Sequence, residues 1–211
     1  MPTALTEENS CERLRYLART KGPEQKTDEW LAARKNIITC SDIAKVVGMS
    51  PFENEEKLFL KKLGYTKFEG NAATRWGCLH EAEAIEFYES ISNKKIADVD
   101  FGLRIHSKYK FIGGSPDGIT FDMKLIEIKC PYRRKYKKGY VPEYYKCQMW
   151  TLMEIFNINE TIYVEYWPPT FSRNAITNVV TVKRNSLWFL SILPKLKKFV
   201  EELTFKREEL V

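Results

Sequence analysis

The sequence predicts an α/β or α+β domain in which a mixed β-sheet is covered by helices. Helical patterns fill the first part of the chain, to about residue 95, and alternation with period two follows from about 96 to 185. A long amphipathic helix from 186 to about 208 closes the chain. A chain of 211 residues is long enough to form one sizeable core, so a single domain is expected over 1–211.

The N-terminal part is expected to consist of short helices followed by one with a stronger pattern. Helical segments are expected at 29–34, 42–47, 54–63 and 80–88. Ser41 is a plausible N-cap for the second segment, and Gly64 closes the third. The last segment has the clearest pattern, because its apolar residues recur at three and four positions: Ala84, Ile85, Tyr88 and Ile91.

The middle of the chain is expected to supply the strands. Residues 119–121, a turn near 122–124 and residues 125–130 form a predicted hairpin that stops at Pro131. A helix is expected from about 143 to 156, and two further strands are expected at 161–166 and 178–182. This order of helices, strands, helix, strands and helix favours a mixed sheet with helices on its faces.

Composition and charge restrict the function only a little. The formal net charge of +6 favours a polyanionic partner weakly. No apolar run reaches the length of a membrane span, and residues 1–8 lack the apolar core of a secretory signal, so an intracellular protein is expected. The five cysteines suggest neither a zinc site nor a disulfide framework and are expected to be reduced and mostly buried: Cys11, Cys40, Cys78, Cys130 and Cys147.

Two acids and a lysine are expected to meet at one end of the predicted hairpin. Glu127 and Lys129 share a face of one strand, because alternate side chains of a strand point the same way. Asp117 lies at the turn that opens the preceding strand, so its carboxylate can reach Glu127. Placing these charges among apolar residues is costly unless a cation balances them. Mg²⁺ would do so with two carboxylates and one carbonyl, for which Ile128 is well placed.

The chemistry that such a site favours is phosphodiester hydrolysis. The metal would activate a water and neutralise charge on the phosphate, and Lys129 would orient the water or add positive charge. The alternative is a surface hairpin on which Glu127 and Lys129 form an exposed ion pair of little energetic value.

The two motifs resemble the signature of the PD-(D/E)xK nucleases. Gly114-Ser115-Pro116-Asp117-Gly118 and Leu125-Ile126-Glu127-Ile128-Lys129-Cys130-Pro131 are similar in particular to the phage lambda exonuclease and YqaJ-type viral recombinase family. The resemblance runs from about Trp30 to Met153. It implies a restriction-endonuclease-like fold and a metal-dependent exonuclease that degrades duplex DNA ends 5′→3′, releases 5′-phosphorylated nucleotides and leaves a 3′ single strand for recombination.

The resemblance also implies roles for individual residues. Asp117, Glu127 and the Ile128 carbonyl resemble the metal ligands, and Lys129 resembles the catalytic lysine. Glu81, in Gly77-Cys78-Leu79-His80-Glu81, would serve a second metal ion; two Mg²⁺ ions are implied, and Mn²⁺ should substitute. Further matches are Gln148 beside the catalytic acids, and Arg34 and Ser41 as holders of a 5′-terminal phosphate.

Two positions depart from the family pattern. Trp150 stands where the family's helix motif, which begins at Tyr145 in this sequence, would carry a second glutamine. Ser107 stands where an additional aspartate would precede the Ser-Pro-Asp-Gly motif. Both departures bear on the second metal ion and leave the first site complete.

Other candidate residues have a structural interpretation beside the functional one. His80 could be a metal ligand next to Glu81, but a histidine with an ordinary structural partner is favoured, because neighbouring helix residues point about 100° apart. The basic run after the catalytic strand is either a solvated loop or, as its closeness to the motif favours, a DNA contact. It consists of Arg133, Arg134, Lys135, Lys137 and Lys138.

The family resemblance implies partners as well as a reaction. It suggests a homotrimer around DNA, a single-strand annealing recombinase as a partner, and no membrane contact. The main alternative is a structure-specific or restriction-like endonuclease of the same superfamily, since the same site can cut ends or interiors. A further alternative is a DNA-end-binding protein without activity, against which the intact Asp117, Glu127 and Lys129 argue.

Overall fold

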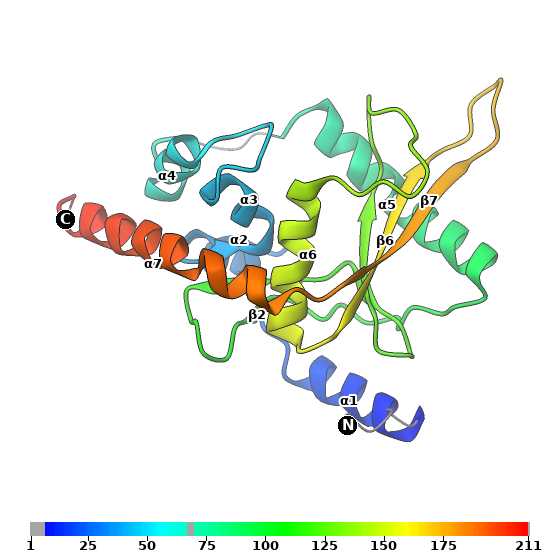
Figure 1. The fold of residues 1–211 in the computed structure, drawn as a ribbon, viewed down its shortest axis with the longest axis horizontal. Helices are drawn as coiled ribbons and strands as arrows, with labels where there is room; N and C mark the ends of the chain where they lie inside the picture. Colours follow the sequence, from blue (N-terminus) through cyan, green and yellow to red (C-terminus); the bar gives the residue numbers. More distant parts are fainter. Residues whose placement is uncertain (1–6, 67–69, 211) are drawn as a thin grey trace.

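The computed structural model describes residues 7–66 and 70–210 (Figure 1). No secretory signal was expected in residues 1–8, and residues 1–6 of that segment lie outside the described part. Among the described helices, none is both long enough and apolar enough to span a bilayer. The described elements are helices around two small mixed sheets, which confirms the predicted fold class.

The N-terminal part is helical, as predicted. It contains α1 (Glu7–Arg19), α2 (Asp28–Lys35), the 3-10 helix η1 (Cys40–Asp42), α3 (Ile43–Val46), α4 (Glu55–Leu63) and α5 (Ala72–Ser92). The prediction that Ser41 is a helix cap was wrong. Thr39 is the cap, because its side chain and that of Asp42 form a reciprocal capping box that leaves Ser41 exposed inside η1. The apolar pattern predicted within α5 is confirmed as helical, although Ile91 at its end is 52% exposed.

The strands form two hydrogen-bonded sheets rather than one. In the first, β3 (Ile112–Gly114) lies between β1 (Ile38–Thr39) and β2 (Arg104–Ile105), parallel to β1 and antiparallel to β2. The second has the order β4-β5-β6-β7, with a parallel pair in its centre. Its strands are β4 (Gly118–Ile119), β5 (Leu125–Lys129), β6 (Glu160–Trp167) and β7 (Ile176–Lys183).

The β5 strand is buried on both faces. On one face, Leu125 belongs to the main core, which includes residues of α6 (Glu143–Phe156) and α7 (Ser186–Glu208). On the other face, Ile126 and Ile128 pack in a second cluster with Ala84 and Tyr88 of α5. Glu127 and Lys129 alternate with these isoleucines, so they point to the α6 side.

The turn that carries Asp117 is held close to α6 by a glycine. Gly114, at the end of β3, is buried, and a Cβ atom on it would collide with Cys40 and Leu152. The following residues, Ser115 and Pro116, lead directly to Asp117 and β4. The close packing therefore fixes where the Ser-Pro-Asp-Gly turn begins.

Candidate active site

Glu127 and Lys129 contact each other at the carboxyl end of β5. The Glu127 side chain is fully buried, and the Lys129 ammonium donates to its Oε1. The second carboxylate oxygen of Glu127, Oε2, accepts a hydrogen bond from Gln148 Nε2 of α6 at 2.9 Å. Asp117 joins the strand through its Oδ2, which accepts from the Ile128 backbone N–H at 2.7 Å. The three motif residues are thus brought together, and the alternative of an exposed surface pair is wrong for Glu127.

The acids of this site repel one another. Burial raises the pKa of Glu127, and the nearby charges of Asp117 and Glu81 raise it further, against the opposing effect of Lys129. Burial and Asp117 also raise the pKa of Glu81. Burial alone would lower the pKa of Lys129, but the Glu127 carboxylate outweighs it and the pKa rises. The cluster therefore has three carboxyl groups, those of Asp117, Glu127 and Glu81, against two ammonium groups, those of Lys129 and Lys26.

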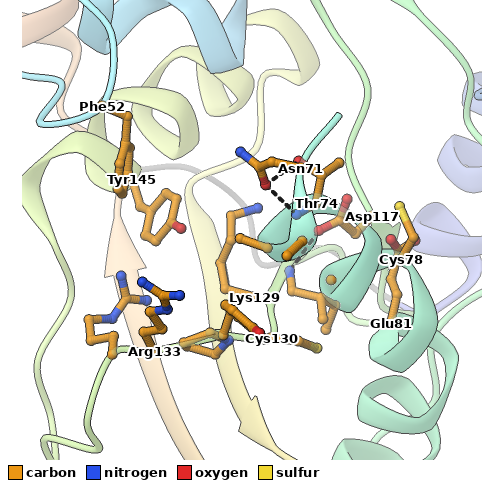
Figure 2. Close-up of a pocket in the computed structure, with 17 residues that line it drawn as sticks. Phe52, Asn71, Thr74, Cys78, Glu81, Asp117, Lys129, Cys130, Arg133 and Tyr145 are labelled. Atoms are coloured by element: carbon orange, nitrogen blue, oxygen red, sulfur yellow. Dashed lines mark hydrogen bonds between the residues drawn. The ribbon is translucent and has the colours of Figure 1, made fainter. Parts of the chain in front are cut away.

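A cavity of about 590 Å³ opens beside these residues (Figure 2). Asp117, Glu81 and Lys129 line it, together with the backbone at the end of β5 and the first turns of α5. A second hollow, of about 660 Å³, shares Glu81 and Asp117 as a common wall. Lys26 lies in that hollow and is the nearest described cation to Glu81, with its Nζ 3.5 Å from Oε1.

The donor set fits a hard divalent cation held by few protein ligands. Within residues 7–66 and 70–210, no three His, Cys, Asp or Glu side chains stand close enough together to hold a metal ion. Mg²⁺ does not need three, because it keeps several waters and binds through one or two carboxylates. Asp117 in the cavity lining and the buried Glu127, whose oxygens contact Lys129 and Gln148, would provide these carboxylates, and a cation would relieve the repulsion among the acids.

The structure favours the structural interpretation of His80. Its Nδ1 lies 2.8 Å from Glu83 Oε2, and its ring packs on Trp76 with 4.2 Å between centroids. His80 is not among the described residues that line the cavity with Glu81 and Asp117. The ligand role stays a prediction, since Nδ1 is held by Glu83 while Nε2 is buried without a hydrogen-bond partner.

Arg34 and Ser41 lie next to each other, as the 5′-phosphate prediction requires. Arg34 Nη2 is 3.4 Å from Ser41 Oγ, and its guanidinium lies 3.9 Å from the ring centroid of Trp30. Trp30 in turn donates from Nε1 to Ser115 Oγ at 2.9 Å. This chain of contacts connects the Arg34 side chain to the turn that carries Asp117.

A buried ion network behind Arg34 was missed by sequence reasoning. Lys62 of α4 lies 3.0 Å from Asp42 Oδ2 and donates to the carbonyls of Arg34 and Ile37, both at 2.7 Å. Asp42 also accepts from Thr39 Oγ1 at 2.6 Å. One ammonium therefore joins the end of α2 to η1 and fixes the segment between Arg34 and Ser41. The sequence signal was weak, because Lys62 is one of three lysines in a short amphipathic helix.

The basic run divides into one anchored residue and several exposed ones. Arg134 forms an ion pair with buried Glu165 and donates to Tyr144 Oη at 2.7 Å, so its guanidinium already has partners. Arg133 is exposed and lines the cavity. Lys135, Lys137 and Lys138 are exposed in the loop beyond it. Arg134 lines the cavity as well, so its ion pair gives it a structural role beside the predicted DNA contact, which stays a prediction for every member of the run.

The two departures from the family pattern lie outside the site. Trp150 Nε1 donates to the Lys183 carbonyl at 3.0 Å, and its ring packs on Trp188 of α7. Ser107 is exposed in the loop after β2.

Three of the five cysteines are buried, but Cys11 and Cys78 are exposed, and Cys78 lines the cavity. Tyr145 and Phe52 also line the cavity and were not anticipated as site residues.

The model of the YqaJ-like viral recombinase domain matches residues 29–159. The chain belongs to this family. The matched segment begins in α2 and ends just after α6, so it contains Glu81, Asp117, Glu127, Lys129 and Gln148 and stops before β6, β7 and α7. The resemblance predicted from the two motifs is therefore confirmed.

Similar proteins include viral ones. The chain is 28% identical over 160 residues to the uncharacterized protein R354 of Acanthamoeba polyphaga mimivirus, covering 67% of this chain and 29% of that protein. It is 28% identical over 176 residues to protein D345L of African swine fever virus, covering 68% of this chain and 50% of that protein. The chain thus spans half or less of the length of these two relatives.

Solved structures agree with the fold. An alkaline exonuclease, LHK-Exo from Laribacter hongkongensis, has a TM-score of 0.72 and 27% identity, with 87% of this chain and 96% of that chain covered. A phage-related exonuclease from Haemophilus somnus has a TM-score of 0.57 and 18% identity over 82% of this chain and 94% of its own, and shows the fold alone. The fold of the family is restriction-endonuclease-like, as predicted.

Proposed function

We propose that this protein is a Mg²⁺-dependent DNA exonuclease that degrades duplex ends 5′→3′ and leaves a 3′ single strand. The observation that carries the proposal is the contact of buried Glu127 with Lys129 beside a cavity that also holds Asp117. A family of viral recombinase domains and a similar structure described as an alkaline exonuclease support it.

The proposed metal ligands are residues that the fold already brings together. Asp117, Glu127 and the Ile128 carbonyl would hold one Mg²⁺ ion, and Glu81 would contribute to a second; Mn²⁺ should substitute. When bound, the ions supply an activated water and neutralise charge on the phosphate. Gln148 holds one oxygen of Glu127, so it sets the orientation of that carboxylate.

Lys129 and Arg133 would supply positive charge close to the phosphate that is cut. Lys129 faces the cavity while its ammonium stays bound to Glu127, and its raised pKa keeps it protonated. A fixed ammonium near the scissile phosphate stabilises the negative charge that grows in the transition state. Arg133 lies in the same cavity and would contact a neighbouring phosphate.

The 5′-phosphate of the substrate would bind at Arg34 and Ser41. The guanidinium is half-buried, packed on Trp30 and close to a hydroxyl, an arrangement that suits a terminal phosphate. Lys135, Lys137 and Lys138 would contact the DNA backbone from the exposed loop. This arrangement is what gives the proposed enzyme its 5′ polarity.

One experiment tests the function: nucleotide release from linear duplex DNA, with Mg²⁺ or EDTA, using 5′-phosphorylated and 5′-hydroxyl ends. We expect release only with the metal, faster from phosphorylated ends, with 5′-mononucleotides as products. The Arg34→Ala variant should lose the preference for phosphorylated ends and keep the metal requirement. Lys195→Ala, a change at an exposed lysine of α7, is the matched control.

Other outcomes would replace the proposal. Cleavage of covalently closed circular DNA at the same rate as linear DNA would make the protein an endonuclease. Binding of DNA ends without any metal-dependent release would make it an end-binding protein. An unchanged preference in Arg34→Ala would remove the 5′-phosphate role.

The proposal extends to assembly and partners. A homotrimer around DNA and a single-strand annealing recombinase that receives the 3′ strand would suit an end-resecting enzyme, and such an enzyme would work in an intracellular compartment. Light scattering of the purified chain, with and without duplex DNA, tests the trimer; a monomer under both conditions would refute it.

A further inference from the structure

Phe52 presents a large apolar ring to the cavity. Its exposed fraction is 74%, yet it lines the same cavity as Asp117 and Lys129. Its backbone is fixed, because Ser50 Oγ accepts hydrogen bonds from the Phe52 and Glu53 N–H groups at 3.2 and 3.3 Å. An ordered turn therefore holds an exposed phenyl ring at the rim of a charged site.

A row of aromatic rings leads from Phe52 to the proposed catalytic lysine. The Phe52 ring stands edge-on to Tyr144, with 5.3 Å between centroids, and Tyr144 lies 4.5 Å from Tyr145. The Lys129 Nζ lies 5.2 Å from the centroid of Tyr145. We name Phe52 and Tyr145, with Tyr144 between them, the aromatic wall.

The aromatic wall and the acids occupy opposite sides of the cavity. Figure 2 shows Phe52 and Tyr145 on one side of Lys129, and Asp117 and Glu81 on the other. Among the described lining residues, Glu81 and Asp117 are the carboxylates, and none lies on the aromatic side. The cavity of about 590 Å³ is within the range of about 300–1,000 Å³ typical of small-ligand sites.

This division matches the two chemical parts of a nucleotide. In a nucleotide whose phosphodiester lies near Lys129, the uncharged sugar and base are attached directly to that phosphate. They would lie on the aromatic side of the cavity, away from the acids. Flat aromatic faces bind nucleobases by stacking, with little dependence on sequence. We infer that the aromatic wall stacks on the nucleobase adjacent to the phosphodiester that is cut, with Phe52 as its principal contact. The inference rests on the proposed nuclease function.

Exposure alone is not the reason for choosing Phe52. Phe171, in the β6–β7 turn, is fully exposed too, but it does not line the cavity. Figure 1 shows this hairpin reaching beyond the rest of the domain. Phe171→Ala is therefore a matched control that removes an exposed phenyl ring far from the proposed subsite.

The test compares ring removal with base removal. Phe52→Ala, Phe52→Leu, Phe52→Trp and Phe171→Ala are measured with 5′-phosphorylated duplexes that are intact or carry one abasic site at the first, second or third nucleotide of the 5′-ended strand. Binding is measured by fluorescence anisotropy in EDTA, and kcat and KM are measured with Mg²⁺. The wild-type protein should bind the intact duplex at least about fivefold more tightly than one of the abasic duplexes, the low end for stacking on an aromatic side chain.

The variants decide the outcome. Phe52→Ala and Phe52→Leu should bind intact and abasic duplexes equally weakly, Phe52→Trp should keep the discrimination, and Phe171→Ala should match the wild type. Discrimination that persists in Phe52→Ala, or a Phe52→Leu variant that behaves as the wild type, overturns the inference, as does a wild type indifferent to every abasic site. Because binding is measured without catalysis, failure of the nuclease proposal would show separately, as absent cleavage.

Discussion

The buried ammonium of Lys62 can be removed with little change of shape by a Lys62→Met substitution. The side chain is 8% exposed, and that of its partner Asp42 is 10% exposed. Methionine keeps most of the length but loses the ion pair and the hydrogen bonds to the Arg34 and Ile37 carbonyls. The substitution therefore tests whether this contact holds α4 against the α2–η1 segment.

The size of the effect follows from the burial of both partners. Breaking a buried ion pair by removing one partner costs about 3–5 kcal/mol. Lys45 still contacts Asp42 at 3.2 Å, so the low end, about 3 kcal/mol, applies here. For a domain of this size, each kcal/mol lowers Tm by about 2–4 °C, which gives a decrease of about 6–12 °C.

Thermal and urea unfolding measure this loss. The control is Lys195→Met. Lys195 of α7 pairs with Glu55, which belongs to α4 as Lys62 does, but both side chains of this pair are 40% exposed or more. That exposed pair should contribute less than about 1 kcal/mol. If Lys62→Met destabilises the protein no more than Lys195→Met does, the reasoning about the buried pair is refuted.

The same network gives a pH dependence with a definite sign. Burial opposes ionisation of Asp42, but Lys62, Lys45 and the Thr39 hydroxyl outweigh it and hold the pKa of Asp42 well below the ordinary value of 3.8. A lowered pKa stabilises the fold above pH 3.8, and this stability is lost as the pH falls below it. Acid unfolding of Asp42→Asn should lack this component. An equally steep loss of stability below pH 4 in that variant would contradict the assignment.

Three further predictions concern the site. Lys129→Ala should slow single-turnover cleavage by about 10²-fold or more and leave the DNA Kd nearly unchanged; near wild-type cleavage would remove its catalytic role. Arg134→Met should lower Tm, because it leaves Glu165 buried without its cation. Arg133→Met should instead raise the DNA Kd and flatten the salt dependence of that Kd, with Tm unchanged. The reverse pattern would contradict both assignments. Mg²⁺ should raise the Tm of the wild type, more strongly as rising pH ionises Glu127, and should not raise that of Asp117→Asn; equal shifts in both proteins would place the ion elsewhere.

The sequence by itself determined the features that depend on local patterns. The helix at 143–156 was predicted at its observed bounds, and the hairpin that carries Glu127 and Lys129 was found because strand alternation is a short-range signal. The same alternation placed both side chains on one face. The family resemblance came from motifs of a few residues, and the family model confirms it.

Only the tertiary structure decided which polar groups have partners. Arg134 is separated from Glu165 by 31 residues, and Lys62 is separated from the Arg34 carbonyl by 28, so no sequence pattern shows that these cations are already occupied. The burial of Glu127 likewise depends on α6, which packs over β5 and supplies Gln148. The aromatic wall depends on the same packing, since it joins Phe52 of the N-terminal part to the start of α6. Local periodicity specifies which face a side chain takes, whereas partners and burial are set by contacts between segments far apart in the chain.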